Sequence, residues 1–312
     1  MHDIEITDQC FDQCKSAGNY LGGKGECIMK KMTKMLSVIL TVAMMAAMLV
    51  ACGSSDSKKS DEKTESTDSK DTIKFGTNAE FPPFEYVTQE GVIGEFDGID
   101  IAIAKDIAEE NGMEAEVENM EFDSLIVALQ NGQVDAVIAG MTVTDERAEK
   151  VDFALPYMKV ALGVVSPDDA LITDVKDLEG KKLIVVKGTT AETYFTENYP
   201  DIELVKFDEY QEAYDALLDG RGDAFSTDNT EVLAWAKQNK GFVVGVESLG
   251  DIDTIAPAVQ KGNTELLNWL NDEIKTLAKE KFFHKDFDET LKSVYGDSID
   301  PENLVVEGGV VE

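Results

Sequence analysis

The sequence predicts an α/β fold with two lobes, and two observations support this prediction. From residue 72 onward, short apolar runs typical of strands alternate with stretches of helical spacing, which favours sheets of mainly parallel strands. Part of this pattern then recurs, because residues 122–136 are echoed by residues 210–224. Both blocks contain the spacing Ala-Leu-x-x-Gly-x-x-Asp-Ala. Two similar α/β units in a chain of 312 residues indicate two lobes.

The individual elements follow from local patterns. Alternating residues predict a strand at Ile73–Gly76, and helical spacing that ends at Asn-Gly predicts a helix at Gly98–Asn111. Between them, Phe81–Gly98 has the character of a hairpin. A second helix is predicted at Phe122–Gln130, followed by a buried strand at Val134–Ala139.

Four strand ends are expected to meet in one cleft. They are Gly76–Phe81 and Gly140–Thr144 in the first unit, and Gly188–Glu192 and Ser226–Asn229 in the second. In open α/β sheets, ligands bind beyond the carboxyl ends of the strands. The sequence therefore predicts a ligand site between the two lobes.

Composition excludes several classes of protein. The net charge is −34, with 62 acidic and 28 basic residues, which argues against a partner made of nucleic acid. The only two histidines are His2 and His284. A Ser-His-Asp triad and a histidine-based metal site are therefore not expected.

The N-terminal region has the features of a processed leader. Lysines at 30, 31 and 34 precede an apolar run at 36–50, which is shorter than the roughly 20 residues that a membrane-spanning helix needs. The run ends in Leu-Val-Ala-Cys52, which resembles the lipobox of bacterial lipoproteins. We expect residues 29–51 to be a lipoprotein signal peptide and Cys52 to carry a lipid anchor outside the cytoplasmic membrane.

The residues on either side of this signal have separate interpretations. Residues 1–28 do not belong to a signal peptide, and we interpret them as a non-native upstream extension. Lys24–Glu26 can be encoded by a ribosome-binding sequence, so the codons of these residues would test this interpretation. Residues 53–71 contain no apolar side chain, so residues 52–71 are predicted to be the lipidated cysteine and a disordered tether.

Two side chains could bind a zwitterion. Arg147 follows a strand end, and a guanidinium matches a carboxylate in a two-pronged geometry, to which Thr142 could add its hydroxyl. Asp228 follows the matching strand end of the second unit and could accept an ammonium group. The alternatives are a surface Arg147 paired with a neighbouring glutamate, and an Asp228 that caps the next helix.

Further candidates surround this pair. Thr190 stands at a helix start, where free backbone N–H groups suit an anion, although Thr189 and Thr190 could also form an ordinary cap. Phe81 and Phe122 could pack on a ligand, although core packing is the commoner role of phenylalanine.

Three stretches carry a resemblance to a known family. GTNAEFPPFEY at 76–86, the run from Glu121 to Tyr157, and GTTAE at 188–192 resemble family 3 solute-binding proteins, the polar amino-acid receptors of ABC importers. The resemblance implies a type II periplasmic-binding-protein-like fold whose lobes are joined by a two-strand hinge. It implies that lobe 1 comprises residues 72–157 plus 256–297, and lobe 2 residues 158–255.

The resemblance also implies the roles of individual residues. Arg147, Thr142 and Thr190 would hold the ligand carboxylate, and Asp228 would bind the α-ammonium together with the carbonyl of Gly140. The remaining implied ligand-binding residues are the aromatic walls, a pocket position and the start of the binding motif: Phe81, Phe122, Asn78 and Met141. Asn78 and Glu80 favour a polar or basic ligand side chain.

The predicted function is capture of an α-amino acid and its delivery to an ABC transporter permease by a monomeric, membrane-anchored protein. No catalytic residue, cofactor, metal or nucleic-acid partner is expected. The alternatives are an enzyme resembling cyclohexadienyl dehydratases, with Glu80 or Glu85 as its acid, and a ligand-sensing receptor. The chain end at residues 284–312 lacks the usual family ending. Residues 298–312 are predicted to be an acidic C-terminal tail, which is expected to be loose over Asp300–Glu312.

Overall fold

The structure is a computed structural model that describes residues 71–88, 95–295 and 300–309. All of these residues belong to one unit, Ser66–Glu312. The predicted upstream extension, the signal peptide, Cys52 and nearly all of the tether lie outside the described residues. Within the described part of the chain, no helix is long and apolar enough to cross a membrane.

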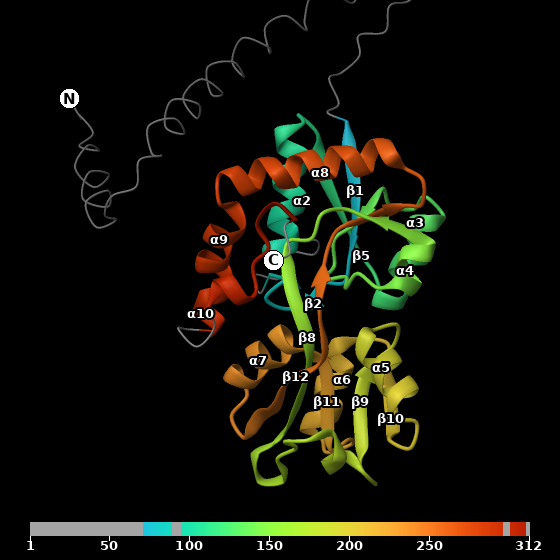
Figure 1. Cartoon of the computed structure of the whole chain (residues 1–312), viewed down its shortest axis with the longest axis vertical. Coiled ribbons are helices and arrows are strands. Elements are labelled where there is room, and N and C mark those ends of the chain that lie inside the picture. Colours follow the sequence, from blue (N-terminus) through green and yellow to red (C-terminus); the bar gives the residue numbers. More distant parts are fainter. Residues whose placement is uncertain (1–70, 89–94, 296–299, 310–312) are drawn as a thin grey trace, which may run out of the picture. The chain divides into compact units, whose positions relative to one another are not determined.

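Two five-stranded sheets form the two lobes (Figure 1). The first has the order β5 (Glu114–Asn119), β1 (Thr72–Thr77), β6 (Ala136–Val137), β13 (Ala258–Gln260) and β7 (Val151–Phe153). The second has the order β10 (Glu203–Phe207), β9 (Lys182–Val186), β11 (Ala224–Asp228), β8 (Met158–Pro167) and β12 (Phe242–Ile255). The two sheets share one plan, as the internal repeat predicts.

The prediction of mainly parallel sheets is wrong. In the first sheet β1 runs parallel to β5 and β6, but β13 runs antiparallel to β6 and β7. In the second, β9 runs parallel to β10 and β11, but β8 runs antiparallel to β11 and β12. In each sheet one strand runs against both of its neighbours: β13 in the first and β8 in the second. Each of these strands begins next to a point where the chain passes between the lobes.

Helices cover both faces of each sheet. In lobe 1, α2 (Ile99–Glu110) and α8 (Thr264–Lys279) bury one face, whereas a 3₁₀ turn at Phe122–Ser124 and α3 (Leu125–Gln130) bury the other. In lobe 2, α6 (Tyr210–Leu218) and α7 (Asn229–Gln238) cover one face and α5 (Thr190–Asn198) the other. The strands between them are therefore apolar on both sides, which explains the continuous apolar runs in the sequence. The remaining helical segments are α4 (Asp145–Lys150), α9 (Phe282–Asp286), a π-helical turn at Phe287–Leu291, α10 (Lys292–Tyr295), and 3₁₀ turns at Asp168–Ala170, Val175–Leu178, Pro301–Asn303 and Glu307–Gly309.

Two strand segments connect the lobes side by side. The first residue of β8, Met158, pairs with the last residue of β12, Ile255. Ile255 also bridges to Thr142 in lobe 1. Figure 1 shows β8 and β12 running from one lobe into the other. This arrangement confirms the predicted two-lobe fold with a two-strand hinge.

A small third sheet lies beside the first lobe. It consists of β2 (Glu80–Phe81), β3 (Glu85–Val87) and β4 (Phe96–Asp97). Gly98, which follows β4, has φ +117°, and a Cβ there would lie 2.1 Å from the carbonyl oxygen of Phe84. Glycine is therefore required at this turn, which holds β3 close to the start of α2.

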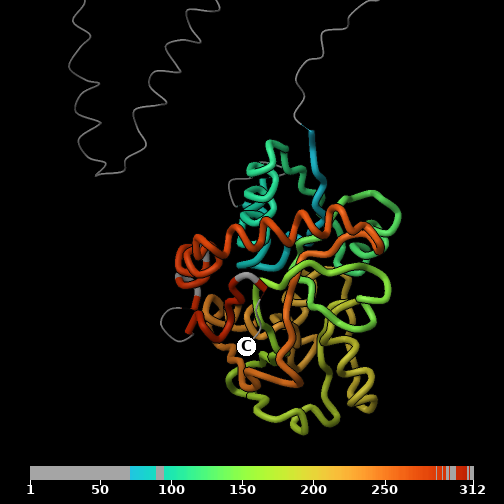
Figure 2. Tube along the Cα trace, turned by 45° about the horizontal axis from the view of Figure 1, so that its top comes forward, coloured from blue at the N-terminus to red at the C-terminus, as the bar shows by residue number. Residues whose placement is uncertain are grey.

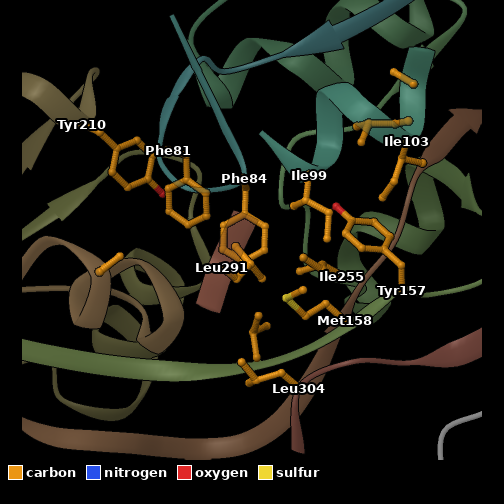
Figure 3. Close-up of a cluster of buried hydrophobic side chains, with 14 of the residues drawn as sticks. Phe81, Phe84, Ile99, Ile103, Tyr157, Met158, Tyr210, Ile255, Leu291 and Leu304 are labelled. Atoms are coloured by element: carbon orange, nitrogen blue, oxygen red, sulfur yellow. The ribbon is translucent and has the colours of Figure 1, made fainter. Parts of the chain in front are cut away.

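The prediction of a loose C-terminal tail is wrong for its apolar residues. Leu304, Val305 and Val306 are buried, and Val305 forms a β-bridge with Met158. The N–H of Val306 donates to the carbonyl of Tyr157 over 2.9 Å. Figure 2 shows this red segment at the junction of the lobes, and Figure 3 shows Leu304 near Met158. The sequence is acidic on average, but this apolar triplet gains more from burial than from exposure to water.

Candidate ligand-binding site

An enclosed pocket lies between the lobes. Its empty volume, which includes the gaps between its wall atoms, is about 290 Å³. Every lining residue except Thr190 is buried. Lobe 1 contributes Asn78, Phe81, Glu85, Phe122, Ala139, Gly140, Thr142 and Arg147, and lobe 2 contributes Thr189, Thr190, Tyr210, Thr227 and Asp228. The four strand ends that the sequence singled out thus contribute to one site.

Arg147 lies in the first turn of α4. The hydroxyl of Thr144 caps this helix by accepting a hydrogen bond from the Arg147 N–H over 3.2 Å. Its guanidinium donates to the carbonyl of Thr142 over 2.8 Å and, across the cleft, to the carbonyl of Gly188 over 2.9 Å. The side chain is buried, and its charged carbon lies 5.2 Å from the ring centroid of Phe122. The surface ion pair with Glu146 or Glu149 that the sequence allowed does not form.

Asp228 is the last residue of β11 and precedes α7. Its side chain makes no capping hydrogen bond, so the alternative role as a helix cap is not realised. Burial raises the pKa of the Asp228 carboxyl to about 7, against the opposing effect of the Arg147 charge. A buried carboxyl without a capping bond is available to a ligand cation.

The charges of the pocket are complementary to each other. Burial lowers the pKa of the Arg147 guanidinium, and the negative charge of Asp228 opposes that shift. The two groups therefore interact through a medium of low dielectric constant, where charges act strongly. A buried cation and a buried carboxyl in one pocket suit a ligand with one carboxylate and one ammonium group.

Aromatic rings and a glycine shape the walls. The rings of Phe81 in lobe 1 and Tyr210 in lobe 2 have centroids 5.0 Å apart (Figure 3). Gly140 has φ +54°, and a Cβ at this position would lie 3.0 Å from the Phe81 ring. The N–H of Gly140 donates to Asp100 over 2.6 Å, which fixes the backbone beside the pocket. A larger residue at position 140 would collide with the Phe81 ring.

A larger open groove adjoins the pocket. Its empty volume, which includes open solvent, is about 1510 Å³, and Phe122, Arg147 and Thr190 border both spaces. Met141 is the one predicted site residue that lines the groove and not the enclosed pocket. The other eight predicted ligand-binding residues of lobes 1 and 2 all line the pocket. The remaining predicted site residue, Cys52, lies outside the described residues.

Five pocket residues were not among the predicted ligand-binding residues: Glu85, Ala139, Thr189, Tyr210 and Thr227. Glu85 was considered only as the acid of an enzyme, and Tyr210 and Thr227 were not assigned a role. The internal repeat contained a signal for Tyr210, because it aligns this residue with Phe122. Nothing in the local sequence marks Glu85, which reaches the pocket because the small third sheet folds onto lobe 1.

Glu85 is the most unusual group in the pocket. It is fully buried and shares a side-chain hydrogen bond with Asp100. Burial raises its pKa well above the usual range, and the neighbouring charge of Asp100 raises it further. Among the residues that the structure describes, no cluster of His, Cys, Asp or Glu has the arrangement of a metal site.

Comparisons with known proteins identify similar chains. The family model of bacterial extracellular solute-binding proteins, family 3, matches residues 73–288. The ABC transporter arginine-binding protein 1 of Escherichia coli is 34% identical over 221 residues, which cover 70% of this chain and 89% of that protein.

Two solved structures extend the comparison. The solute receptor for L-cysteine of Neisseria gonorrhoeae is 45% identical with a TM-score of 0.73, covering 76% of this chain and 96% of that one. An ancestral amino-acid-binding protein, described as a precursor of cyclohexadienyl dehydratase, is 33% identical with a TM-score of 0.65, covering 70% and 95%.

Proposed function

This chain belongs to family 3 of the bacterial extracellular solute-binding proteins, and on that premise we propose that it captures a free α-amino acid between its lobes and delivers it to an ABC importer. The names of its relatives support this ligand class, because they include an arginine-binding protein and an L-cysteine receptor.

The observation that carries the proposal is the pairing of Arg147 with Asp228 in one buried pocket. Arg147 would bind the ligand carboxylate, with help from Thr142 and the start of the helix at Thr190. Asp228 and the carbonyl of Gly140 would accept the α-ammonium group. Each charge-assisted hydrogen bond contributes roughly 1.5–3 kcal/mol. Several such bonds support micromolar affinity, about −8 kcal/mol, after ordering costs.

Closure of the lobes would complete this site. The two halves already touch through the Arg147 bond to Gly188, and the N–H of Gln211 donates to Glu80 over 3.3 Å. A ligand that bridges Arg147 in lobe 1 and Asp228 in lobe 2 makes contacts that only the closed form offers. It would therefore shift the population toward that form, which the permease would recognise.

Attachment to the membrane through Cys52 is part of the proposal. The lysines, the apolar run and the small residues before this cysteine support a lipoprotein signal. Radiolabelled fatty acid should enter the wild-type protein but not the Cys52→Ala variant when each is expressed in bacteria. Equal labelling of both would remove the anchor from the proposal.

A binding role is favoured over an enzymatic one. The buried acid Glu85 could serve as a general acid, and one solved relative is described as a dehydratase precursor. However, Asp228 in the same pocket would repel the second carboxylate of a ring diacid. The relative in question is itself described as an amino-acid-binding protein.

Thermal unfolding with added ligands tests the proposal. Ligand-free protein would be melted with each of the twenty amino acids and cystine, alongside Arg147→Ala as the control. One or a few amino acids should raise the melting temperature of the wild type but not of the variant. If no amino acid raises it, the ligand class is wrong.

A further inference from the structure

The pocket restricts the size of the ligand through a contact between the lobes. Phe81 comes from lobe 1 and Tyr210 from lobe 2, and their ring centroids are 5.0 Å apart, which is within the range of attractive aromatic pairs. Figure 3 shows Phe81 between Tyr210 and Phe84. Phe81 and Tyr210 form one wall of the pocket, and Phe84, whose ring centroid lies 5.6 Å from that of Phe81, packs against Phe81 without lining the pocket.

This wall has little freedom to move aside. Behind Tyr210, the ring of Phe225 lies 6.3 Å away, and the Tyr210 hydroxyl lies 3.2 Å from that of Thr227. The hydrogen bond from Gln211 to Glu80 joins the lobes beside the same contact. The empty volume of the pocket, about 290 Å³ with the gaps between its wall atoms included, lies just below the roughly 300–1,000 Å³ of typical ligand pockets. A longer ligand side chain that stays within this pocket must therefore separate Phe81 from Tyr210 and hold the lobes apart.

The polar groups of the pocket add a chemical requirement. Asn78 donates its amide N–H to the carbonyl of Met120 over 3.0 Å, and its buried side-chain oxygen has no partner. Glu85 lines the same pocket, but it already shares a side-chain hydrogen bond with Asp100. Buried polar atoms are normally hydrogen-bonded, so the Asn78 oxygen on the lobe 1 side calls for a hydrogen-bond donor from the ligand.

We propose that this site selects α-amino acids with a small side chain that carries a hydrogen-bond donor, of the size of serine or cysteine. The aromatic pair of Phe81 and Tyr210 sets the size limit, and the side-chain oxygen of Asn78 receives the donor. This inference rests on the proposed function, because Arg147 and Asp228 must first hold the α-amino-acid headgroup. It narrows the polar or basic side chain that the sequence favoured to a small and neutral one.

Calorimetric titration of the ligand-free protein tests the size limit. The ligands are serine, cysteine, alanine, glutamine and arginine. Serine or cysteine should bind at least tenfold tighter than glutamine and arginine, and also tighter than alanine, which lacks the donor. Glutamine or arginine binding as tightly as the best small ligand would overturn the size limit. Alanine matching both small polar ligands would overturn the role of the donor.

Substitutions at Tyr210 test whether the ring pair of Phe81 and Tyr210 sets the limit on ligand size. Tyr210→Ala should bring glutamine within tenfold of the small ligands, because the wall then opens. Tyr210→Phe keeps the ring and should retain the wild-type ranking. If Tyr210→Ala fails to fold, Phe81→Leu opens the same wall from the other lobe. An unchanged ranking in a folded variant would show that the ring pair does not set the limit. If the wild type binds no amino acid at all, the proposed function itself fails, whereas a different ranking refutes only this inference.

Discussion

Replacing Asp228 by Asn should make the ligand-free protein more stable at high pH while it abolishes binding. The folded-state pKa of Asp228 is about 7, raised mainly by burial from the ordinary 3.8. Folding therefore favours the protonated carboxyl. The stability that the protonated Asp228 carboxyl contributes is present at low pH and is lost as the pH rises from about 4 to about 7. The difference of about three pKa units between the unfolded and folded states corresponds to about 4 kcal/mol in the free energy of unfolding.

The expected difference can be measured between two accessible pH values. From pH 5 to pH 8, the free energy of unfolding of the wild type should fall by about 2–3 kcal/mol more than that of Asp228→Asn, as the two pKa values require. Urea denaturation of both proteins without ligand gives this difference. Asp201→Asn is a matched control, because Asp201 is exposed on the same lobe and should follow the wild type.

The result that would refute this reasoning is clear. If Asp228→Asn and the wild type lose stability in parallel from pH 5 to pH 8, Asp228 is already ionised in the folded protein at pH 5. Binding of the ligand ammonium group would then not require Asp228 to release a proton. If instead the variant gains stability but still binds its ligand, Asp228 is not the group that binds the ammonium.

Four further predictions follow from the same geometry. Ligand affinity should fall by up to roughly tenfold per pH unit below 7, because binding requires ionised Asp228; calorimetry from pH 5 to 8 measures this. Arg147→Lys should weaken binding at least roughly tenfold, since a lysine lacks the planar fork, while unfolding by urea shows whether the fold is kept. Gly188→Ala should weaken binding and cost roughly 1–2 kcal/mol of stability, because φ is +74° and the new Cβ would lie 2.8 Å from Asp123 across the cleft; unchanged affinity would mean that the lobes do not close as far as seen. Leu304→Ala should cost roughly 2–5 kcal/mol in urea unfolding because the residue is buried, whereas the exposed Leu171→Ala should cost much less.

Local patterns were sufficient to predict the elements near the site. The predicted helix at Gly98–Asn111 is α2 at Ile99–Glu110, and the strand at Ile73–Gly76 lies within β1. The predicted strand at Val134–Ala139 is shorter, with only Ala136–Val137 in β6, because its neighbours pair over few residues. Periodicity and end signals depend on residues close in the chain, which explains why these predictions succeed.

The sequence predicted those residues of the site that stand at the ends of strands. Arg147 and Asp228 each follow a strand end, so their approach to the cleft could be inferred from the repeat. Glu85 and Tyr210 could not be placed in the same way. Glu85 enters through a small separate sheet, and Tyr210 meets Phe81 only because the two lobes face each other.

The sequence by itself determined two α/β lobes, a cleft at their strand ends and the charged pair that suits an amino acid. These features depend on short-range patterns and on a repeat within the chain. Only the tertiary structure decided the antiparallel halves of the sheets, the burial of Leu304–Val306 and the aromatic contact between Phe81 and Tyr210. Each of these depends on contacts between residues far apart in sequence, whose geometry is set by how the two lobes pack together.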